Sequence, residues 1–299
     1  MTDSLNSRYA AVKCPCCGFS GALRQYQERY DINGRKVDIA TCLGCTALVN
    51  ASDLKESRDS GKSEDIQRQA SESYYKVDEN TLASARDRAN QMLELVDFAL
   101  THLGNDFPRR RFADFGAGMG FLSAAAALRF EKSYAIEYNT TALEQLHSLF
   151  ENSERIQICT GIDALPTDVD LVASWHTIEH LPDAQAVLRN VHDHLSAGGG
   201  LFFQCPMFKP EYVVQTHYFF LNEFACHVMC ELAGFEDIHV WFDMESEFIT
   251  CLARKGRRSR RAVQKSTTRF SATRHHGLAR TRGTSLLARA RALLRRLAR

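Results

Sequence analysis

The chain has 299 residues, 44% of them hydrophobic and 24% charged, which excludes a disordered or membrane-spanning protein and is typical of a globular one. Its 37 basic and 36 acidic residues nearly balance, but 16 of the basic ones follow Ala253, so an acidic body with a net charge of −15 precedes a basic tail. The polar start does not resemble a secretion signal, and we therefore expect a cytoplasmic protein whose ten cysteines are ligands or core residues.

Residues 1–50 contain two Cys-x-x-Cys pairs, Cys14 with Cys17 and Cys42 with Cys45. Such pairs bind one tetrahedral zinc ion, and the segment Asp31–Arg35 between them is typical of a hairpin turn. This arrangement resembles a zinc ribbon, which implies a closed structural zinc site with Cys16 left over. The other five cysteines lie in apolar runs and are predicted to be core residues: Cys159, Cys205, Cys226, Cys230 and Cys251.

Residues 51–80 are polar and predict a solvated, partly helical linker. From residue 81 to residue 255, helical patterns alternate with short β-rich runs, beginning with a helix over Leu82–Leu100. This alternation predicts a doubly wound α/β fold with parallel strands. The strand-like runs are Phe112–Phe115, Tyr134–Glu137, Ile156–Cys159, Leu171–Trp175 and Leu201–Gln204, and the helices between them are Leu122–Phe130, Leu143–Phe150 and Ala184–Leu195.

A final pair of strands follows the helix predicted over Glu223–Ala233. Ile238–Phe242 and Phe248–Leu252 are separated by the polar turn Asp243–Glu247, which favours an antiparallel hairpin. With the five runs above, the chain is expected to form a mostly parallel, Rossmann-like sheet of seven strands.

The first of these strands ends in a glycine-rich loop, Asp114–Gly120. Glycines permit a tight turn and let backbone N–H groups approach a ligand, and ligands bind beyond the carboxyl ends of such strands. A dinucleotide site would place its third glycine at position 121, which is Phe121; Gly120 stands one residue earlier. The glycine order therefore argues against NAD.

Two more polar features follow the next two strands. Glu137 ends the second strand, where a carboxylate can accept the ribose hydroxyl hydrogens of a nucleotide-like cofactor. Gly161–Pro166 follows the third strand and could border an adenine. One such feature alone would be only a turn or a surface acid, but three at successive strand ends together indicate a cofactor site.

The segment from about residue 81 to 255 resembles the class I S-adenosylmethionine-dependent methyltransferases. The resemblance is carried by Asp114-x-Gly-x-Gly-x-Gly120, Glu137, Asp170-Leu-Val and Leu195-Ser-Ala-Gly-Gly-Gly200. It implies that the loop glycines pack against the methionine part, that Asp114 orients the loop and the cofactor ammonium, and that Glu137 holds the ribose. Either Asp163 or Ile162 would lie near the adenine. The expected cofactor-binding residues are Asp114, Gly116, Ala117, Gly118, Gly120, Glu137, Ile162, Asp163 and Trp175.

The fourth strand runs into a segment rich in histidine. If Thr177–His180 begin a helical turn, then His176, Glu179 and His180 share one face, and His217 after the fifth strand could return to it. Histidine titrates near neutral pH and suits removal of the acceptor's proton. Three histidines and a glutamate could instead hold a divalent ion.

The run His176-x-x-Glu179-His180 resembles a variant of the Glu-x-x-Glu-His segment found in methyltransferases of quinone precursors and of small-RNA 2′-hydroxyls, which use divalent metal. Here a histidine replaces the first glutamate, which puts the metal in doubt. The run is also similar to one in sugar and polysaccharide methyltransferases, where histidine is a plausible base. A purely structural role in fixing the loop is a further alternative, because Glu179-His180-Leu181 occurs widely in this superfamily.

Residues 256–299 form the basic tail. Its first part, to residue 283, is polar and without periodicity, which is typical of disorder. Thr284–Arg299 has leucines on one helical face and arginines on the other. Such a helix suits an anionic membrane surface, nucleic acid phosphates or the acidic body, and a solvated extension without a role is also consistent with it.

From these features we expect an O-methyltransferase that acts on a sugar, a polysaccharide intermediate or a similar hydroxylated small molecule. An RNA 2′-hydroxyl methyltransferase is the first alternative, weakened by the acidic body. A zinc-ribbon interaction protein with a vestigial methyltransferase fold is the second, and the intact glycine loop argues against it. The expected cofactors are S-adenosylmethionine and structural zinc, with a divalent active-site metal left open. Peripheral membrane contact would come from the tail.

Overall fold

The computed structural model describes residues 12–20, 23–30, 36–60, 79–214 and 216–256. The predicted turn Asp31–Arg35, residues 61–78 of the predicted linker and the tail beyond Gly256 lie outside the described residues. The chain divides into two compact units. The glycine-loop unit comprises Ser63–Thr177 and Asp193–Phe203, and the cysteine unit comprises Met1–Lys62, Ile178–His192 and Gln204–Arg299.

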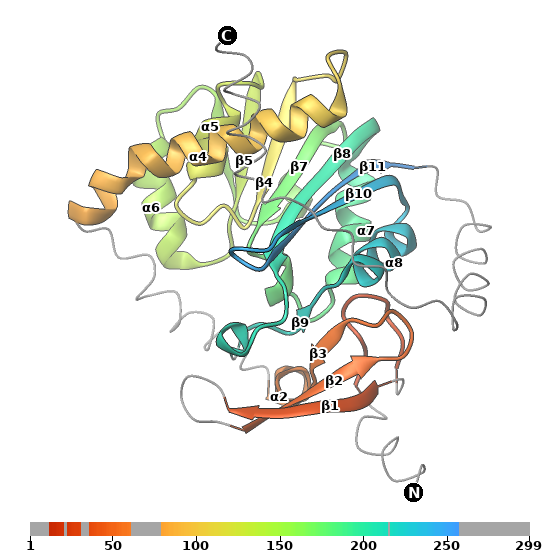
Figure 1. Cartoon of the computed structure of the whole chain (residues 1–299). Helices are drawn as coiled ribbons and strands as arrows, with labels where there is room; N and C mark the ends of the chain where they lie inside the picture. Colours follow the sequence, from red (N-terminus) through yellow and green to blue (C-terminus); the bar gives the residue numbers. More distant parts are fainter. Residues whose placement is uncertain (1–11, 21–22, 31–35, 61–78, 215, 257–299) are drawn as a thin grey trace, which may run out of the picture. The chain divides into compact units, whose positions relative to one another are not determined.

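Parallel strands form the centre of the glycine-loop unit (Figure 1). β4 pairs in parallel with both β5 and β7, and β5 pairs in parallel with β6. Most of their residues are buried on both faces, as expected for strands covered by helices on two sides. These strands are β4 (Arg111–Phe115), β5 (Lys132–Ile136), β6 (Ile156–Cys159) and β7 (Val169–Trp175).

Three helices accompany these strands: α4 (Glu79–Leu103), α5 (Phe121–Ala126) and α6 (Thr140–Phe150). α4 is held by an ion pair between Asp97 and Arg129 at 2.6 Å and by packing of Phe98 on Phe202. The helix predicted over Leu122–Phe130 ends earlier, at Ala126. The apolar sequence pattern extends to Phe130 because this side chain is buried in the core. The residues after Ala126 form turns, however, and Leu128 is 63% exposed.

The seven-stranded sheet has the order β10-β11-β8-β7-β4-β5-β6, which confirms the predicted doubly wound, mostly parallel α/β fold. β10 and β11 form the predicted antiparallel hairpin. β8 begins at Leu195, six residues before the predicted start, and its early part includes Gly198 with a left-handed φ of 73°. The remaining elements here are α7 (Ala184–His194), β8 (Leu195–Pro206), α8 (Glu223–Ala233), β10 (Phe235–Asp243) and β11 (Phe248–Lys255).

A small antiparallel sheet in the cysteine unit confirms the predicted N-terminal β module. Its order is β1-β2-β3-β9, so its last strand comes from far along the chain, and Figure 1 shows β9 beside β3. The strands are β1 (Leu23–Tyr30), β2 (Lys36–Cys42), β3 (Leu48–Asn50) and β9 (Phe219–Phe220), and α2 (Ala51–Ser60) follows β3. β9 was not predicted, because two residues carry no strand periodicity.

The helices in the described part of the chain do not include one with the length and apolar character needed to cross a membrane.

Candidate functional site

The glycine loop after β4 has left-handed backbone at three positions. The φ angles of Gly116, Gly118 and Gly120 are 79°, 54° and 78°, a region in which residues with a side chain are strained. The N–H groups of Gly116 and Ala117 both donate to the carbonyl oxygen of Ile136 at 2.9 Å. Gly120 then begins α5 as its N-cap. The loop is thereby fixed against the carboxyl end of β5.

Two of these glycines are also required by packing. A Cβ atom on Gly116 would overlap the side chain of Thr177, which follows β7. A Cβ atom on Gly120 would come within 2.6 Å of Phe150 and 2.7 Å of Leu146. The absence of side chains lets the loop, the segment after β7 and α6 approach one another closely.

Asp114 lies at the end of β4 and is 1% exposed. Its carboxylate accepts a hydrogen bond from Ser123 Oγ at 2.7 Å. Burial raises the pKa of Asp114 to about 7, the Ser123 hydrogen bond opposes the rise, and the nearby charge of Glu137 adds to it. Asp114 therefore changes charge near neutral pH, and a cation beside it would favour the ionised form.

Glu137 follows β5, as the sequence predicted for a ribose-binding carboxylate. Its Oε2 accepts the N–H of Gly118 at 2.8 Å, and its Oε1 accepts those of Tyr138 at 2.7 Å and Asn139 at 2.9 Å. A carboxylate oxygen has two lone pairs, so in this conformation Oε2 has room for one further donor. Glu137 can accept one ribose hydroxyl while it still holds the glycine loop.

The segment after β6 leaves both predicted adenine contacts as candidates. Ile162 begins η1 (Ile162–Ala164) and is buried, whereas Asp163 is exposed.

Aromatic side chains pack near the carboxyl ends of β5 and β7. The ring of Tyr138 packs edge-on against that of Phe115, with ring centroids 6.0 Å apart. Trp175, at the end of β7, packs against Phe202 with ring centroids 5.7 Å apart.

His176 does not have the helical backbone that the predicted spacing required. Its φ is 52°, a left-handed value that is rare for a residue with a side chain. Only Ile178–His180 form a helical turn, η2. The expected shared face of His176, Glu179 and His180 is therefore wrong at His176, because an interval of three or four residues aligns side chains only along a continuous helix.

Glu179, His180 and His217 are brought together in the cysteine unit. One carboxylate oxygen and one nitrogen of each imidazole lie within 4.8 Å of one another. Glu179 is 1% exposed, and the two imidazole rings meet edge to face with centroids 4.7 Å apart. We call these three residues the Glu-His-His group. It combines three of the four predicted catalytic residues.

Backbone carbonyls orient both imidazoles of this group. His180 Nδ1 lies 2.8 Å from the carbonyl oxygen of Thr216, and His217 Nδ1 lies 2.7 Å from that of Tyr212. A carbonyl oxygen can only accept, so each Nδ1 carries the hydrogen. In the neutral ring, Nε2 then holds the lone pair with which a histidine binds a proton or a metal ion.

The two Cys-x-x-Cys pairs bring four buried thiols together. The sulfur atoms of Cys14 and Cys45 are 3.7 Å apart, and those of Cys17 and Cys42 are 3.5 Å apart. Zinc–sulfur bonds of about 2.3 Å in a tetrahedron require sulfur separations of about 3.8 Å, so the thiols fit a zinc ion. Hydrogen bonds from Cys16 and then from the other thiols hold the pKa of Cys14 well below its ordinary value.

The remaining cysteines are buried, as predicted. Three of them, Cys226 and Cys230 on α8 and Cys251 on β11, have sulfur atoms within 4.8 Å of one another. The distance between Cys230 Sγ and Cys251 Sγ is 3.8 Å, which is ordinary contact between packed sulfur atoms. These thiols fill the space between a helix and a strand.

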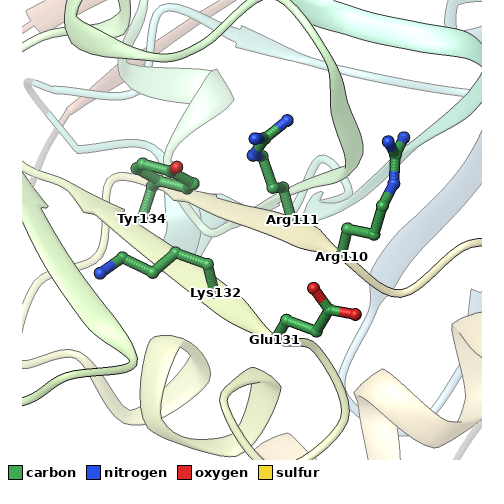
Figure 2. A pocket seen from close by; sticks show the side chains of 5 residues that line it. All are labelled: Arg110, Arg111, Glu131, Lys132 and Tyr134. Carbon is green, nitrogen blue, oxygen red and sulfur yellow. The ribbon is translucent and has the colours of Figure 1, made fainter.

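A basic pocket of about 310 Å³ lies at the opposite end of the strands from the glycine loop. Figure 2 shows its lining, which comes from the amino ends of β4 and β5 and the residues before them: Arg110, Arg111, Glu131, Lys132 and Tyr134. Arg110 forms an ion pair with Asp170 at 3.0 Å, and Arg111 forms one with Asp168. Ligands of doubly wound sheets bind at the carboxyl ends, so this pocket is not the cofactor site.

Several groups of the site escaped prediction from the sequence. Ser123 and Thr177 contact the predicted Asp114 and Gly116, but serine and threonine are too common to single out. The carbonyl oxygens that orient the imidazoles belong to Tyr212 and Thr216. Every residue has a backbone carbonyl, so the sequence does not show which of them accepts a hydrogen bond from an imidazole.

The family assignment follows from a match over residues 84–240 to the family described as methyltransferase domain. The match spans more than half of the chain and contains the glycine loop, Glu137 and the Glu-His-His group. The chain belongs to this methyltransferase family. It carries an S-adenosylmethionine-dependent methyltransferase domain, and the matched residues include the glycine loop at the carboxyl end of β4.

Relatives of known name share part of this domain. The ubiquinone biosynthesis O-methyltransferase of Pseudomonas syringae pv. tomato is 33% identical over 100 residues, which cover 31% of this chain and 43% of that protein. The enzyme of the same name from Idiomarina loihiensis is 29% identical over 100 residues, 31% of this chain and 41% of that protein. The chain thus spans less than half the length of these relatives.

Solved structures of low identity are also similar. The CurJ carbon methyltransferase has a TM-score of 0.47 and 13% identity, with 56% of this chain and 54% of that chain covered. An S-adenosylmethionine-dependent methyltransferase from Mesorhizobium loti has a TM-score of 0.42 and 16% identity, with 52% and 95% covered.

Proposed function

We propose that this protein transfers a methyl group from S-adenosylmethionine to a hydroxyl oxygen of a small molecule, such as a sugar or a polysaccharide intermediate. The observation that carries this proposal is the Glu-His-His group. Two of its members, Glu179 and His180, follow Thr177 closely in the chain, and Thr177 contacts Gly116 of the glycine loop. The names of the relatives, ubiquinone biosynthesis O-methyltransferases, support oxygen as the methyl acceptor.

The glycine-loop unit would bind the cofactor. S-adenosylmethionine supplies an electrophilic methyl group and leaves as S-adenosylhomocysteine. Gly116, Ala117, Gly118 and Gly120 offer close backbone approach, the ionised Asp114 attracts the cofactor ammonium, and one lone pair of Glu137 accepts a ribose hydroxyl. The remaining proposed contacts are Ile162, Asp163 and Trp175.

The cysteine unit would deprotonate the acceptor. Nε2 of His180 or His217 accepts the hydroxyl proton as the new carbon–oxygen bond forms, and the Nδ1 hydrogen bond to a carbonyl stabilises the resulting imidazolium. The buried carboxylate of Glu179 favours the same positive charge. His176 is a further candidate base, because strained left-handed residues cluster at functional sites.

A divalent ion bound by the Glu-His-His group is a second candidate for this chemistry. One carboxylate oxygen and two imidazole nitrogens within 4.8 Å form a suitable ligand set, and such an ion would polarise an acceptor hydroxyl. Loss of turnover on removal of a bound divalent ion other than zinc, with recovery on its return, would favour this candidate over a metal-free histidine base.

We also propose that Cys14, Cys17, Cys42 and Cys45 bind one structural zinc ion. The support is their burial, their sulfur separations and their arrangement in two matched turns. Four thiolates leave no open coordination position, so this ion would hold the fold and take no part in the methyl transfer.

The test is release of S-adenosylhomocysteine by the purified full chain with matched acceptors: a hydroxylated sugar, a catechol and an RNA with a free terminal 2′-hydroxyl. Turnover with the sugar supports the proposal in full, and turnover with the catechol alone retains O-methylation but removes the sugar. Turnover with the RNA alone replaces the proposal by the RNA alternative. Cofactor binding measured by calorimetry without any turnover would favour a vestigial enzyme.

A further inference from the structure

β9 joins the small sheet of the cysteine unit to the Glu-His-His group. Val49 and Leu48 of β3 pair with Phe219 and Phe220, which follow His217 and Tyr218 in the chain. The N–H of Asn50 donates to the carbonyl oxygen of Tyr218 at 2.9 Å, and the N–H of Tyr218 donates to that of Glu179 at 2.8 Å. One buried residue beside His217 thus links β3 to the backbone of Glu179.

The first cysteine turn is fixed to the start of α7, shortly after His180. The N–H of Gln185 donates to the carbonyl oxygen of Pro15 at 2.9 Å. In the orientation that satisfies both ends of its amide, the buried Gln185 side chain donates to the carbonyl oxygen of Cys16 at 2.6 Å and accepts the N–H of Ala233 at 3.1 Å. The turn that contains Cys14 and Cys17 therefore anchors the segment after His180.

The second cysteine turn is fixed to the start of α8, shortly after His217. Asn222 Nδ2 donates to the carbonyl oxygen of Thr46 at 3.0 Å, and Asn222 Oδ1 caps α8 by accepting the N–H of Ala225 at 2.9 Å. Thr46 follows Cys45 and has a left-handed φ of 64°, a strained conformation that the turn must hold in place.

A shared apolar core completes the connection. Val37 and Ile39 of β2 pack with Val213 and Phe220, and Tyr212 packs against this cluster. The carbonyl oxygen of Tyr212 is the group that orients His217, and the ring of Phe220 lies 6.1 Å from the His217 ring. The small sheet thus supports the segment that carries both imidazole-orienting carbonyls.

We propose that metal binding by Cys14, Cys17, Cys42 and Cys45 positions His180 and His217, so that loss of this ion disables the Glu-His-His group and leaves cofactor binding intact. This inference rests on the proposed function only for the consequence to turnover. The physical reason is that β3, both cysteine turns and the core hold the two histidine segments from opposite ends, and a module this small needs a metal ion to stay folded. The four cysteines and Gln185 are positioning residues.

The experiment uses the full chain with labelled histidine, in which the imidazole NMR signals of His180 and His217 are assigned through His180→Ala and His217→Ala. In Cys42→Ser we expect loss of zinc, displaced or broadened signals from both histidines, and a fall in kcat of at least about ten-fold with unchanged cofactor affinity. Cys16→Ala, in the same turn but outside the ligand set, should retain zinc and wild-type signals.

If Cys42→Ser loses cofactor binding through general unfolding, Gln185→Met serves as the second test of whether the cysteine turn positions the histidines. It keeps the four thiols and the histidines but removes the amide bridge, and we expect retained zinc, shifted imidazole signals and a lower kcat with an altered pH profile. Wild-type imidazole signals in Gln185→Met or in zinc-free Cys42→Ser would overturn the inference. If the wild type turns over no hydroxylated acceptor, the proposed function fails, and the imidazole signals still test positioning by the metal.

Discussion

At the scale of single residues, Asp114 is the buried carboxyl for which we propose a contact with the cofactor ammonium. Its pKa is about 7 in the cofactor-free chain because the carboxyl is buried, compared with 3.8 ordinarily. Because the folded-state pKa lies above the unfolded value, ionisation of Asp114 costs folding stability. The stability that its protonated form contributes is therefore lost as the pH rises from about 4 to about 7. A bound cation reverses the preference, and binding of the cofactor should therefore release a proton below neutral pH.

We accordingly predict that cofactor affinity falls as the pH drops below about 7, approaching ten-fold per pH unit as Asp114 becomes protonated. Asp114→Asn should bind the cofactor weakly at all pH values and without this dependence. Calorimetry from pH 5 to pH 8, about the range of the transition, measures both. An equal pH dependence in wild type and Asp114→Asn would show that another group is responsible.

Gly116 and Gly104 offer a matched comparison, because both have positive φ but only one is crowded. The φ of Gly104 is 91°, with open space where a Cβ would stand, so Gly104→Ala should cost about 1 kcal/mol of folding free energy. Gly116→Ala must also displace Thr177 and should cost on the order of 3 kcal/mol and weaken cofactor binding. Denaturant unfolding measures the loss of folding free energy in both variants. Equal losses in Gly104→Ala and Gly116→Ala would mean that the loop tolerates a side chain.

At the scale of elements, the two cysteine turns are built alike although their sequences differ. The residue after the second cysteine is left-handed in both, Gly18 in one and Thr46 in the other. We predict that Cys17→Ala lowers the zinc content well below the about one ion per chain of the wild type, while Cys16→Ala leaves it unchanged. Metal analysis of the purified chains decides this, and equal zinc in all three would exclude Cys17 as a ligand.

The elements that the sequence predicted well are those with a strong period. α8 and β6 have the predicted bounds because each combines a clear apolar pattern with polar ends. β9 escaped because two phenylalanines pair with a strand far away in the sequence, which no local pattern encodes. The early start of β8 was not predicted because glycines, such as the left-handed Gly198, favour turns and carry no strand periodicity.

At the scale of the whole molecule, the predicted site residues divide between the two units. The proposed cofactor contacts were chosen because strand ends, glycines and an acidic residue follow one another in chain order, and they stay a prediction. The Glu-His-His group could be predicted only in part. His217 lies in the group as expected, because the chain returns to Glu179 and His180 after β8. His176 was assigned from helical spacing, and its left-handed backbone shows that it is not part of a helix.

In the proposed function, histidines of the Glu-His-His group serve the acceptor and not the cofactor. The most direct measurement is kcat together with the cofactor Kd for the wild type and His217→Ala, in the full chain with the best hydroxylated acceptor. We predict that kcat falls at least about ten-fold while Kd stays unchanged, because the lost group acts only on the acceptor proton. Unchanged turnover, or a loss of cofactor affinity that accounts for the whole decrease, would contradict this account.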